Sequence, residues 1–359
     1  MSIVAKTMNN HHSSLMPPTS LINYFKIAYG VNENKLFIQI IDSGNRTPGK
    51  LFRFHFSKNQ DFIIKPVALL NQSDWQENIH YLIDFIKFCN KEKLSVVKIC
   101  STKFSSKFGS KGCYWITDGT IVYLVFRYIM QEQKFPGYSA YCTAIGEFSA
   151  TLHDTANLFH PKCKIPKFSF VQSIEVTLRL LQVPINNIQI NPKELWIALE
   201  EYRNMYLILL RIAFDIVTEM EKNCRTSHIH GDLKPDNVLW VREKQFSVID
   251  FDLCHFGSIT NEFHNIIVGS EKKNPLRFDI SHAEATISAY NRYSSKKITE
   301  QEKRVIQLTV VARFAERFAV TFKLPNSPFY FLKDSLQIQA RIKEYQLIND
   351  LVKWSAIKL

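Results

Sequence analysis

Residues near the middle of the chain have the types and spacing that phosphoryl transfer needs. The run 228–240 reads HIHGDLKPDNVLW, and VIDFD follows at 248–252. Such a reaction needs one carboxylate to orient the attacking hydroxyl and take its proton, and oxygen ligands to hold Mg²⁺ against the phosphates. Asp232 suits the first role, and Asn237 and Asp250 suit the second.

The segments around these residues predict how the chain brings them together. Pro235 lies between the first two and favours an irregular loop, because proline lacks a backbone donor and fixes φ. The apolar runs 238–241 and 246–249 flank the polar run 242–245 and predict a β-hairpin. This hairpin would return Asp250 to the loop, so we expect the three side chains to meet at one end of it.

Together these motifs resemble the protein-kinase-like superfamily, and within it the branch of aminoglycoside phosphotransferases, choline kinases and homoserine kinases. Protein kinases carry His-Arg-Asp and Asp-Phe-Gly. This chain has Gly231 and Asp252 at the two differing positions, although Leu233-Lys234-Pro235 is spelled as in protein kinases. The resemblance implies an α+β, two-lobed protein-kinase-like fold, with a small antiparallel-sheet N-lobe and a larger, mainly helical C-lobe.

For the loop, the resemblance implies a role for each polar residue. Asp232 would be the catalytic base, and Asn237 and Asp250 would bind Mg²⁺. Lys234 would either steady the transferring phosphate or point into solvent. Asp252 would reach a second metal or the acceptor, or form a structural hydrogen bond beneath the loop. His230, outside these roles, is expected to brace the loop through buried hydrogen bonds.

Three strand-like runs, 36–41, 51–56 and 62–65, predict an antiparallel meander in the first third of the chain. The last run ends in Lys65, and an amphipathic helix is expected around Glu77. The resemblance implies that Lys65 contacts the α and β phosphates of ATP and pairs with Glu77.

Two further segments are assigned to nucleotide binding by the resemblance. No G-x-G-x-x-G motif is present, and 43–49 is the candidate for a loop over the phosphates. The strand 121–126 is followed by a segment similar to the hinge between lobes. Backbone groups of Arg127 and Ile129 would there meet the adenine edge.

Composition agrees with a globular enzyme. The 359 residues are 46% hydrophobic and 13% aromatic, enough for buried cores. The seven cysteines are scattered without a C-x-x-C pair, which disfavours a disulfide framework or a zinc site and fits a reducing cytoplasm. Neither a signal sequence nor a membrane span is predicted. We expect a loose tail at 1–20, a nucleotide-binding N-lobe and hinge at 21–130, and a catalytic, acceptor-binding C-lobe at 131–359.

The formal net charge is +12, from 45 Lys and Arg against 33 Asp and Glu. The positive residues are dispersed and form no basic block, so a dedicated nucleic-acid role is disfavoured, and nucleotide phosphates alone would favour a positive site. The same balance disfavours a polycationic aminoglycoside acceptor. A zwitterionic, anionic or neutral hydroxyl compound fits better.

We therefore expect an ATP- and Mg²⁺-dependent kinase that phosphorylates a small-molecule hydroxyl. Two alternatives stay open: a Ser/Thr protein kinase of the same fold, and an inactive nucleotide-binding scaffold or RNA-associated protein. Acceptor choice is expected to depend on the segment 161–204, whose basic residues are available to anionic groups: Lys162, Lys164, Lys167 and Arg179. Relatives often place an Asp at a helix start after the metal carboxylate, where this chain has Asn261-Glu262-Phe263-His264.

Overall fold

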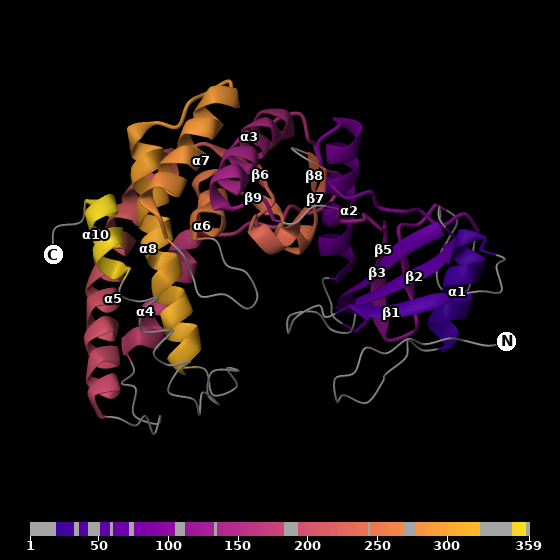
Figure 1. The fold of residues 1–359 in the computed structure, drawn as a ribbon, viewed down its shortest axis with the longest axis horizontal. Helices are drawn as coiled ribbons and strands as arrows, with labels where there is room; N and C mark the ends of the chain where they lie inside the picture. Colours follow the sequence, from indigo (N-terminus) through magenta and orange to yellow (C-terminus); the bar gives the residue numbers. More distant parts are fainter. Residues whose placement is uncertain are drawn as a thin grey trace. The chain divides into compact units, whose positions relative to one another are not determined.

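The chain folds into two compact units, which are described separately (Figure 1). The computed structural model describes residues 19–31, 36–41, 51–57, 60–71, 75–104, 112–132, 135–182, 193–242, 245–268, 278–323 and 347–356. The first unit takes in described residues up to Glu132, together with His160–Ile165 and Leu239–Asp252. The second contains Gln133–Phe159, Pro166–Val238 and the chain from Leu253 onward.

The first unit is built on a five-stranded antiparallel sheet with the strand order β1-β2-β3-β5-β4. Its elements are α1 (Thr19–Tyr29), β1 (Phe37–Ile41), β2 (Leu51–Ser57), β3 (Gln60–Leu69), α2 (Trp75–Lys91), β4 (Trp115–Thr117), β5 (Ile121–Arg127), β7 (Val238–Arg242) and β8 (Gln245–Val248). The predicted meander is confirmed as β1 to β3. Helix α1 begins at Thr19, inside the stretch that we expected to be a loose tail.

Alternation along β2 and β3 gives this sheet one apolar and one polar face. Phe52, Phe54 and the neighbouring strand residues on the apolar face are buried. They pack against Phe25 of α1, whose ring centroid lies 5.2 Å from that of Phe54. Arg53 is on the other face, and Lys65 follows the same alternation along β3. The sheet therefore presents Lys65 away from its aromatic core.

The predicted hairpin is confirmed as the two-stranded sheet of β7 and β8. Strand β8 also joins the segment that follows α2, since the N–H of Val97 donates to the carbonyl oxygen of Val248 at 2.9 Å and the N–H of Val248 donates to that of Ser95 at 2.7 Å. These bonds fix the end of β8, and with it Asp250, within the first unit.

The second unit is mainly helical. Its elements are α3 (Tyr138–Ala156), α4 (Phe170–Gln182), α5 (Lys193–Met220), the 3₁₀ turn Glu221–Asn223, β6 (Thr226–Ile229), the 3₁₀ turn Pro235–Asn237, β9 (His255–Ser258), α6 (Thr260–Val268), α7 (Ile280–Tyr293), α8 (Glu300–Lys323) and α10 (Ile348–Ser355). Strands β6 and β9 pair antiparallel. A further 3₁₀ turn, Phe251–Leu253, spans the boundary between the two units. The expected α+β class, with a sheet-based part and a mainly helical part, is confirmed.

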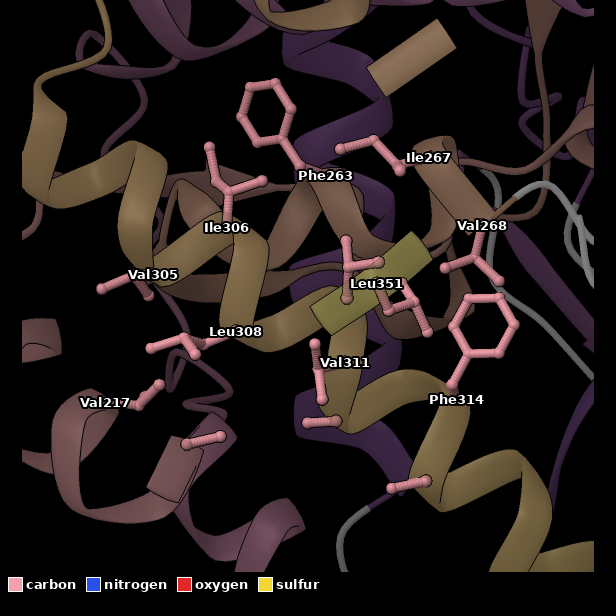
Figure 2. Packing of buried hydrophobic residues seen from close by; sticks show 14 of the residues in the cluster. Val217, Phe263, Ile267, Val268, Val305, Ile306, Leu308, Val311, Phe314 and Leu351 are labelled. Atoms are coloured by element: carbon pink, nitrogen blue, oxygen red, sulfur yellow. The ribbon is translucent and has the colours of Figure 1, made fainter. Parts of the chain in front are cut away.

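Helix α8 runs through the main apolar core of this unit, where side chains from α5, α6 and α10 pack around it (Figure 2). Val217 of α5, Phe263 of α6 and Leu351 of α10 are fully buried in this core, as is Phe314 of α8 itself. Burial of such side chains is worth about 1.5–3 kcal/mol each. Helix α6, which reappears in the site below, is thus fixed in the core by Phe263.

The start of α8 forms a capping box. Thr299 Oγ1 accepts the N–H of Glu302 at 3.1 Å, and the Glu302 carboxylate accepts the N–H of Thr299 at 3.0 Å. Glu302 is buried and also receives the Arg225 guanidinium, with Nε at 2.8 Å. Burial alone would raise the pKa of Glu302, but these donors lower it below its ordinary value. In the described part of the chain, no helix has the length and apolar character needed to cross a membrane.

Candidate active site

The loop after β6 turns sharply at Gly231. Its φ is +79°, a conformation that side chains with a Cβ rarely adopt. A Cβ at this position would also overlap the carbonyl oxygen of Leu253. Gly231 is therefore required where protein kinases carry arginine, and it lets the chain pass close to the segment before β9.

Asp232 is a buried carboxylate held by three nitrogen donors. Its Oδ2 lies 2.5 Å from Nζ of Lys234 and 3.0 Å from Nδ2 of Asn237. Its Oδ1 lies 3.2 Å from Nδ2 of Asn265. Lys234 thus contacts the predicted base and does not simply extend into solvent, with 23% of its side chain exposed.

Asn237 ends the 3₁₀ turn that Pro235 begins, as expected for an irregular loop. Its Nδ2 donates to the main-chain oxygen of Asp232 at 2.8 Å as well as to the carboxylate. Since an Asn amide has one nitrogen and one oxygen, this orientation commits the nitrogen and leaves Oδ1 as the atom suited to a cation.

Glu262 anchors the backbone of the same loop, a role that the sequence analysis did not predict. Its carboxylate accepts the N–H of His230 at 2.7 Å and the N–H of Gly231 at 3.0 Å. Glu262 is buried at the start of α6, with Nε2 of His153 3.8 Å away. Burial alone would raise its pKa, but His153, His230 and the backbone donor lower it. In the sequence, Glu262 is recognisable only as an acidic residue in the first turn of the helix that follows β9.

The expected bracing role of His230 is confirmed. The ring is fully buried, and its Nδ1 accepts the N–H of Asp232 at 3.2 Å. His153 is also part of the core, with Nδ1 3.1 Å from the hydroxyl oxygen of Tyr290. His230 therefore braces the loop directly, whereas His153 lies in the core next to Glu262.

In the first unit, Lys65 contacts two carboxylates that lie 185 and 187 residues further along the chain. Its Nζ is 2.5 Å from Oδ1 of Asp250 and 2.7 Å from Oδ1 of Asp252. Burial alone would lower the pKa of Lys65, but Asp252 and Asp250 outweigh it and raise the pKa. Asp252 is thus an ion-pair partner of Lys65 in this structure, and the roles expected for it at a second metal, at the acceptor or beneath the loop stay predictions.

The predicted Lys65–Glu77 pair is wrong in this structure. Glu77 lies on the exposed side of α2, and its carboxylate pairs with Lys164 at 3.4 Å, with both side chains more than half exposed. The described carboxylates that contact Lys65 are those of Asp250 and Asp252. The physical reason is the docking of β8, which brings these two residues to the polar face of the sheet.

Asp250 has a left-handed backbone conformation, with φ +69°. Such a conformation is uncommon for residues other than glycine and often marks a functional position, although Asp tolerates it better than most. The next residue, Phe251, is buried and packs edge-on against Phe85 of α2, with ring centroids 6.0 Å apart. This packing helps to hold the turn that directs Asp250 toward Lys65.

The proposed hinge segment follows β5. The N–H of Arg127 donates to the carbonyl oxygen of Lys98 at 2.9 Å, and the guanidinium of Arg127 lies over the Phe62 ring at 4.8 Å. Adenine contacts by Arg127 and Ile129 stay a prediction, and Arg127 would need to use a group other than its N–H. The expected phosphate loop at 43–49 lies outside the described residues.

The expected acceptor segment, 161–204, includes α4 and the first part of α5, while 183–192 lie outside the described residues. One of its basic residues, Lys164, pairs with Glu77 as described above. Another, Arg179, pairs with Glu175 one turn earlier in α4, at 2.5 Å. Both pairs are exposed and contribute little stability. A role of this segment in acceptor choice stays a prediction.

The structure also bears on metal binding. Within the described ranges, no group of three or more His, Cys, Asp and Glu side chains is arranged to hold a metal ion. Asn237 belongs to the second unit and Asp250 to the first. Their sharing of one Mg²⁺ therefore stays a prediction.

Two buried polar atoms near Asp232 have no hydrogen-bond partner among the described residues: the hydroxyl oxygen of Tyr141 and Nδ1 of His264. Asp232 contributes to the electrostatic environment of both side chains. Burial raises the pKa of Tyr141 well above its ordinary value, and burial with the charge of Arg313 lowers the pKa of His264 to about 4. Unsatisfied groups of this kind often bind a water or a ligand.

Comparison with known proteins gives a family match for most of the chain. The model of a family described as the phosphotransferase enzyme family matches residues 52–295. This range contains β2 to α7, and with them Lys65, Asp232, Asn237 and Asp250. A search of curated proteins found no match.

Solved structures share the fold at low sequence identity. A microcompartment-associated aminopropanol kinase has a TM-score of 0.65 at 14% identity, covering 94% of this chain and 99% of the other. A spectinomycin phosphotransferase has a TM-score of 0.62 at 14% identity, covering 96% and 98%. A choline kinase from Cryptosporidium parvum has a TM-score of 0.53 at 13% identity, covering 95% and 100%. The expected resemblance to this branch is confirmed.

Proposed function

Because the chain belongs to the phosphotransferase enzyme family, we propose that it transfers the γ-phosphoryl group of ATP to a hydroxyl group of a small molecule, with Mg²⁺ as the metal. The single observation that carries this proposal is the arrangement of Asp232, a buried carboxylate in a loop with Asn237 beside it. A carboxylate held in this way suits a group that orients a hydroxyl and takes its proton.

In the proposed reaction, the acceptor oxygen attacks the γ-phosphorus as its proton passes to Asp232, and the bond to the β-phosphate oxygen breaks to release ADP. Lys234 lies beside the base and would steady the transferring phosphate, moving away from Asp232 to do so. Lys65 would contact the non-transferred phosphates, in exchange for its present carboxylate partners.

Mg²⁺ would be held by the Asn237 amide oxygen and the Asp250 carboxylate. The donor set fits this ion, because Mg²⁺ prefers oxygen ligands and is usually bound by one or two carboxylates together with phosphate oxygens. The absence of a larger acidic cluster within the described residues is compatible with this requirement. The metal would neutralise charge that develops on the phosphates during transfer.

The class of acceptor is inferred from proteins of similar fold and from the charge of the chain. Among the proteins of similar fold, one is named as an aminopropanol kinase, one as a choline kinase, and one was solved with ADP and spectinomycin. These names share a hydroxyl-bearing small molecule as substrate class. With a net charge of +12, we favour acceptors that are zwitterionic, anionic or neutral over polycations.

A screen for ADP release tests this function. The purified chain is given ATP and Mg²⁺ with amino alcohols, amino acids, sugars, nucleosides and aminoglycosides in separate reactions, and with a generic protein substrate as a further arm. Acceptor-dependent ADP release and a phosphorylated product with one small-molecule class are expected. Phosphorylation confined to the protein arm, or ATP binding without any transfer, would contradict the proposal.

A further inference from the structure

The two carboxylate oxygens of Asp232 are held by different parts of the second unit. Oδ2 receives Lys234 and Asn237, which both lie in the same loop as Asp232. Oδ1 receives Nδ2 of Asn265, 33 residues further along the chain on α6. Asn265 is only 7% exposed, so little water competes for this hydrogen bond.

Helix α6 contacts the loop through two side chains on one face. Glu262 and Asn265 are three residues apart, a spacing that places side chains next to each other on a helix. Glu262 holds the backbone N–H groups of His230 and Gly231, while Asn265 holds the carboxylate and also lies 3.3 Å from the carbonyl oxygen of Gly231. One rigid element thus fixes both the loop and the direction of its carboxylate.

We propose that Asn265 is a positioning residue for the phosphotransferase reaction, which holds Oδ1 of Asp232 so that Oδ2 faces the acceptor hydroxyl. This inference rests on the proposed function. It assigns a distinct task to each donor: Lys234 is partly exposed and leaves for the phosphate, whereas Asn265 is buried on a helix and remains. A misplacement of a reacting group by about 1 Å can cost roughly 100-fold in rate.

A purely structural role of Asn265 predicts a loss of stability without a loss of turnover. If Asn265 serves only to satisfy the carbonyl oxygen of Gly231, its removal lowers stability but leaves the turnover of folded molecules unchanged. The kcat of folded protein therefore distinguishes a positioning role of Asn265 from a structural one, and KM for ATP serves as an internal reference.

The chain offers a matched control on the same helix. Asn261 is also buried, and its Nδ2 also donates toward a carboxylate, that of Glu221 at 3.4 Å, but it does not contact Asp232. The experiment compares Asn265→Ala and Asn265→Asp with Asn261→Ala and Asn261→Asp. Each variant is assayed for ADP release, with an acceptor from the screen or with water, for KM of ATP and for its urea midpoint.

Asn265→Ala is expected to lower kcat roughly 10- to 100-fold with little change in KM for ATP. Asn265→Asp has the same shape but replaces the donor by a carboxylate beside Oδ1, so its kcat should fall at least as far. Both Asn261 variants should keep kcat within about twofold of the wild type. A kcat within twofold for Asn265→Ala, or equal losses in the Asn261 variants, would overturn the proposal.

The proposal is also tested without turnover, which separates its failure from failure of the proposed function. A wild-type chain that binds ATP but never releases ADP refutes the function alone. In that case a double-mutant cycle tests the proposal: the urea unfolding midpoints of Asn265→Ala, Asp232→Ala and the double variant are compared with that of the wild type. Non-additive midpoints support the contact that the proposal requires, and additive midpoints overturn it.

Discussion

Nδ2 of Asn237 lies 3.0 Å from Oδ2 of Asp232 and 2.8 Å from the main-chain oxygen of the same residue. One amide nitrogen thereby ties the predicted base to the predicted metal ligand, five residues away and across a 3₁₀ turn. Because the nitrogen is used twice within the protein, the amide is oriented before any ligand binds. This orientation underlies the assignment of Mg²⁺ to the amide oxygen.

The role of Asp250 as a metal ligand predicts a loss of metal dependence in Asp250→Ala. The wild type should bind ATP more tightly in Mg²⁺ than in EDTA. Loss of a residue that only supports a metal ligand costs roughly 10- to 100-fold in metal affinity. In Asp250→Ala the increase in ATP affinity caused by Mg²⁺ should therefore shrink by at least this factor. Isothermal titration calorimetry in the two buffers measures it.

Asp252→Ala is the matched control, since Asp252 contacts the same lysine. If Asp252 has only a structural role, its variant keeps the Mg²⁺ response. Full retention of the response by Asp250→Ala would show that the metal is bound elsewhere.

Gly231→Ala should lower both stability and turnover, because the substitution adds strain at φ +79° and a clash with the Leu253 carbonyl oxygen. Gly119→Ala provides the control: its φ is +98°, but nothing lies within 4 Å of the added Cβ. The control should lose about 1–2 kcal/mol, the backbone cost alone, and keep its turnover. Urea unfolding and ADP release check both variants, and equal behaviour of the two would refute the close approach at Gly231.

The acid sensitivity of the fold is predicted to depend on His264. Burial, together with the positive charge of Arg313, lowers its pKa to about 4 from an ordinary 6.5. Between these two values the unfolded chain binds a proton at this position that the folded chain does not. The free energy of unfolding is therefore fully retained above pH 6.5 and falls as the pH drops toward 4, by roughly 2 kcal/mol between pH 7 and pH 5 from this group.

His264→Phe removes the titrating group while keeping an aromatic ring beside Phe170. The ring centroids of His264 and Phe170 are 5.6 Å apart. Denaturation in urea at pH 7 and pH 5 should show a smaller loss for this variant than for the wild type. Equal losses in the two proteins would mean that His264 is protonated in the folded state.

Local patterns in the sequence predicted much of the fold. The meander and the hairpin of β7 and β8 each depend on residues close in sequence, where alternation and turns are readable. Asp232 and Asn237 were also identified correctly as neighbours, because five residues and a proline separate them.

Contacts between distant residues could not be read in the same way. The partner of Lys65 was predicted wrongly, because Glu77 is near in sequence whereas Asp250 reaches Lys65 only after β8 docks. The roles of Glu262 and Asn265 were missed for a similar reason. Their contacts with the loop depend on where the core places α6. A Glu or an Asn in a sequence does not by itself indicate that it holds a distant loop.

In the proposed function, Asp232 takes part in the chemical step and not in nucleotide binding. The most direct test is the rate of ADP release by Asp232→Asn, measured beside its affinity for ATP with Mg²⁺. We predict that the rate falls by about 10² to 10⁴, the range typical of a positioned base, while the affinity for ATP stays almost unchanged. An unchanged rate would contradict it.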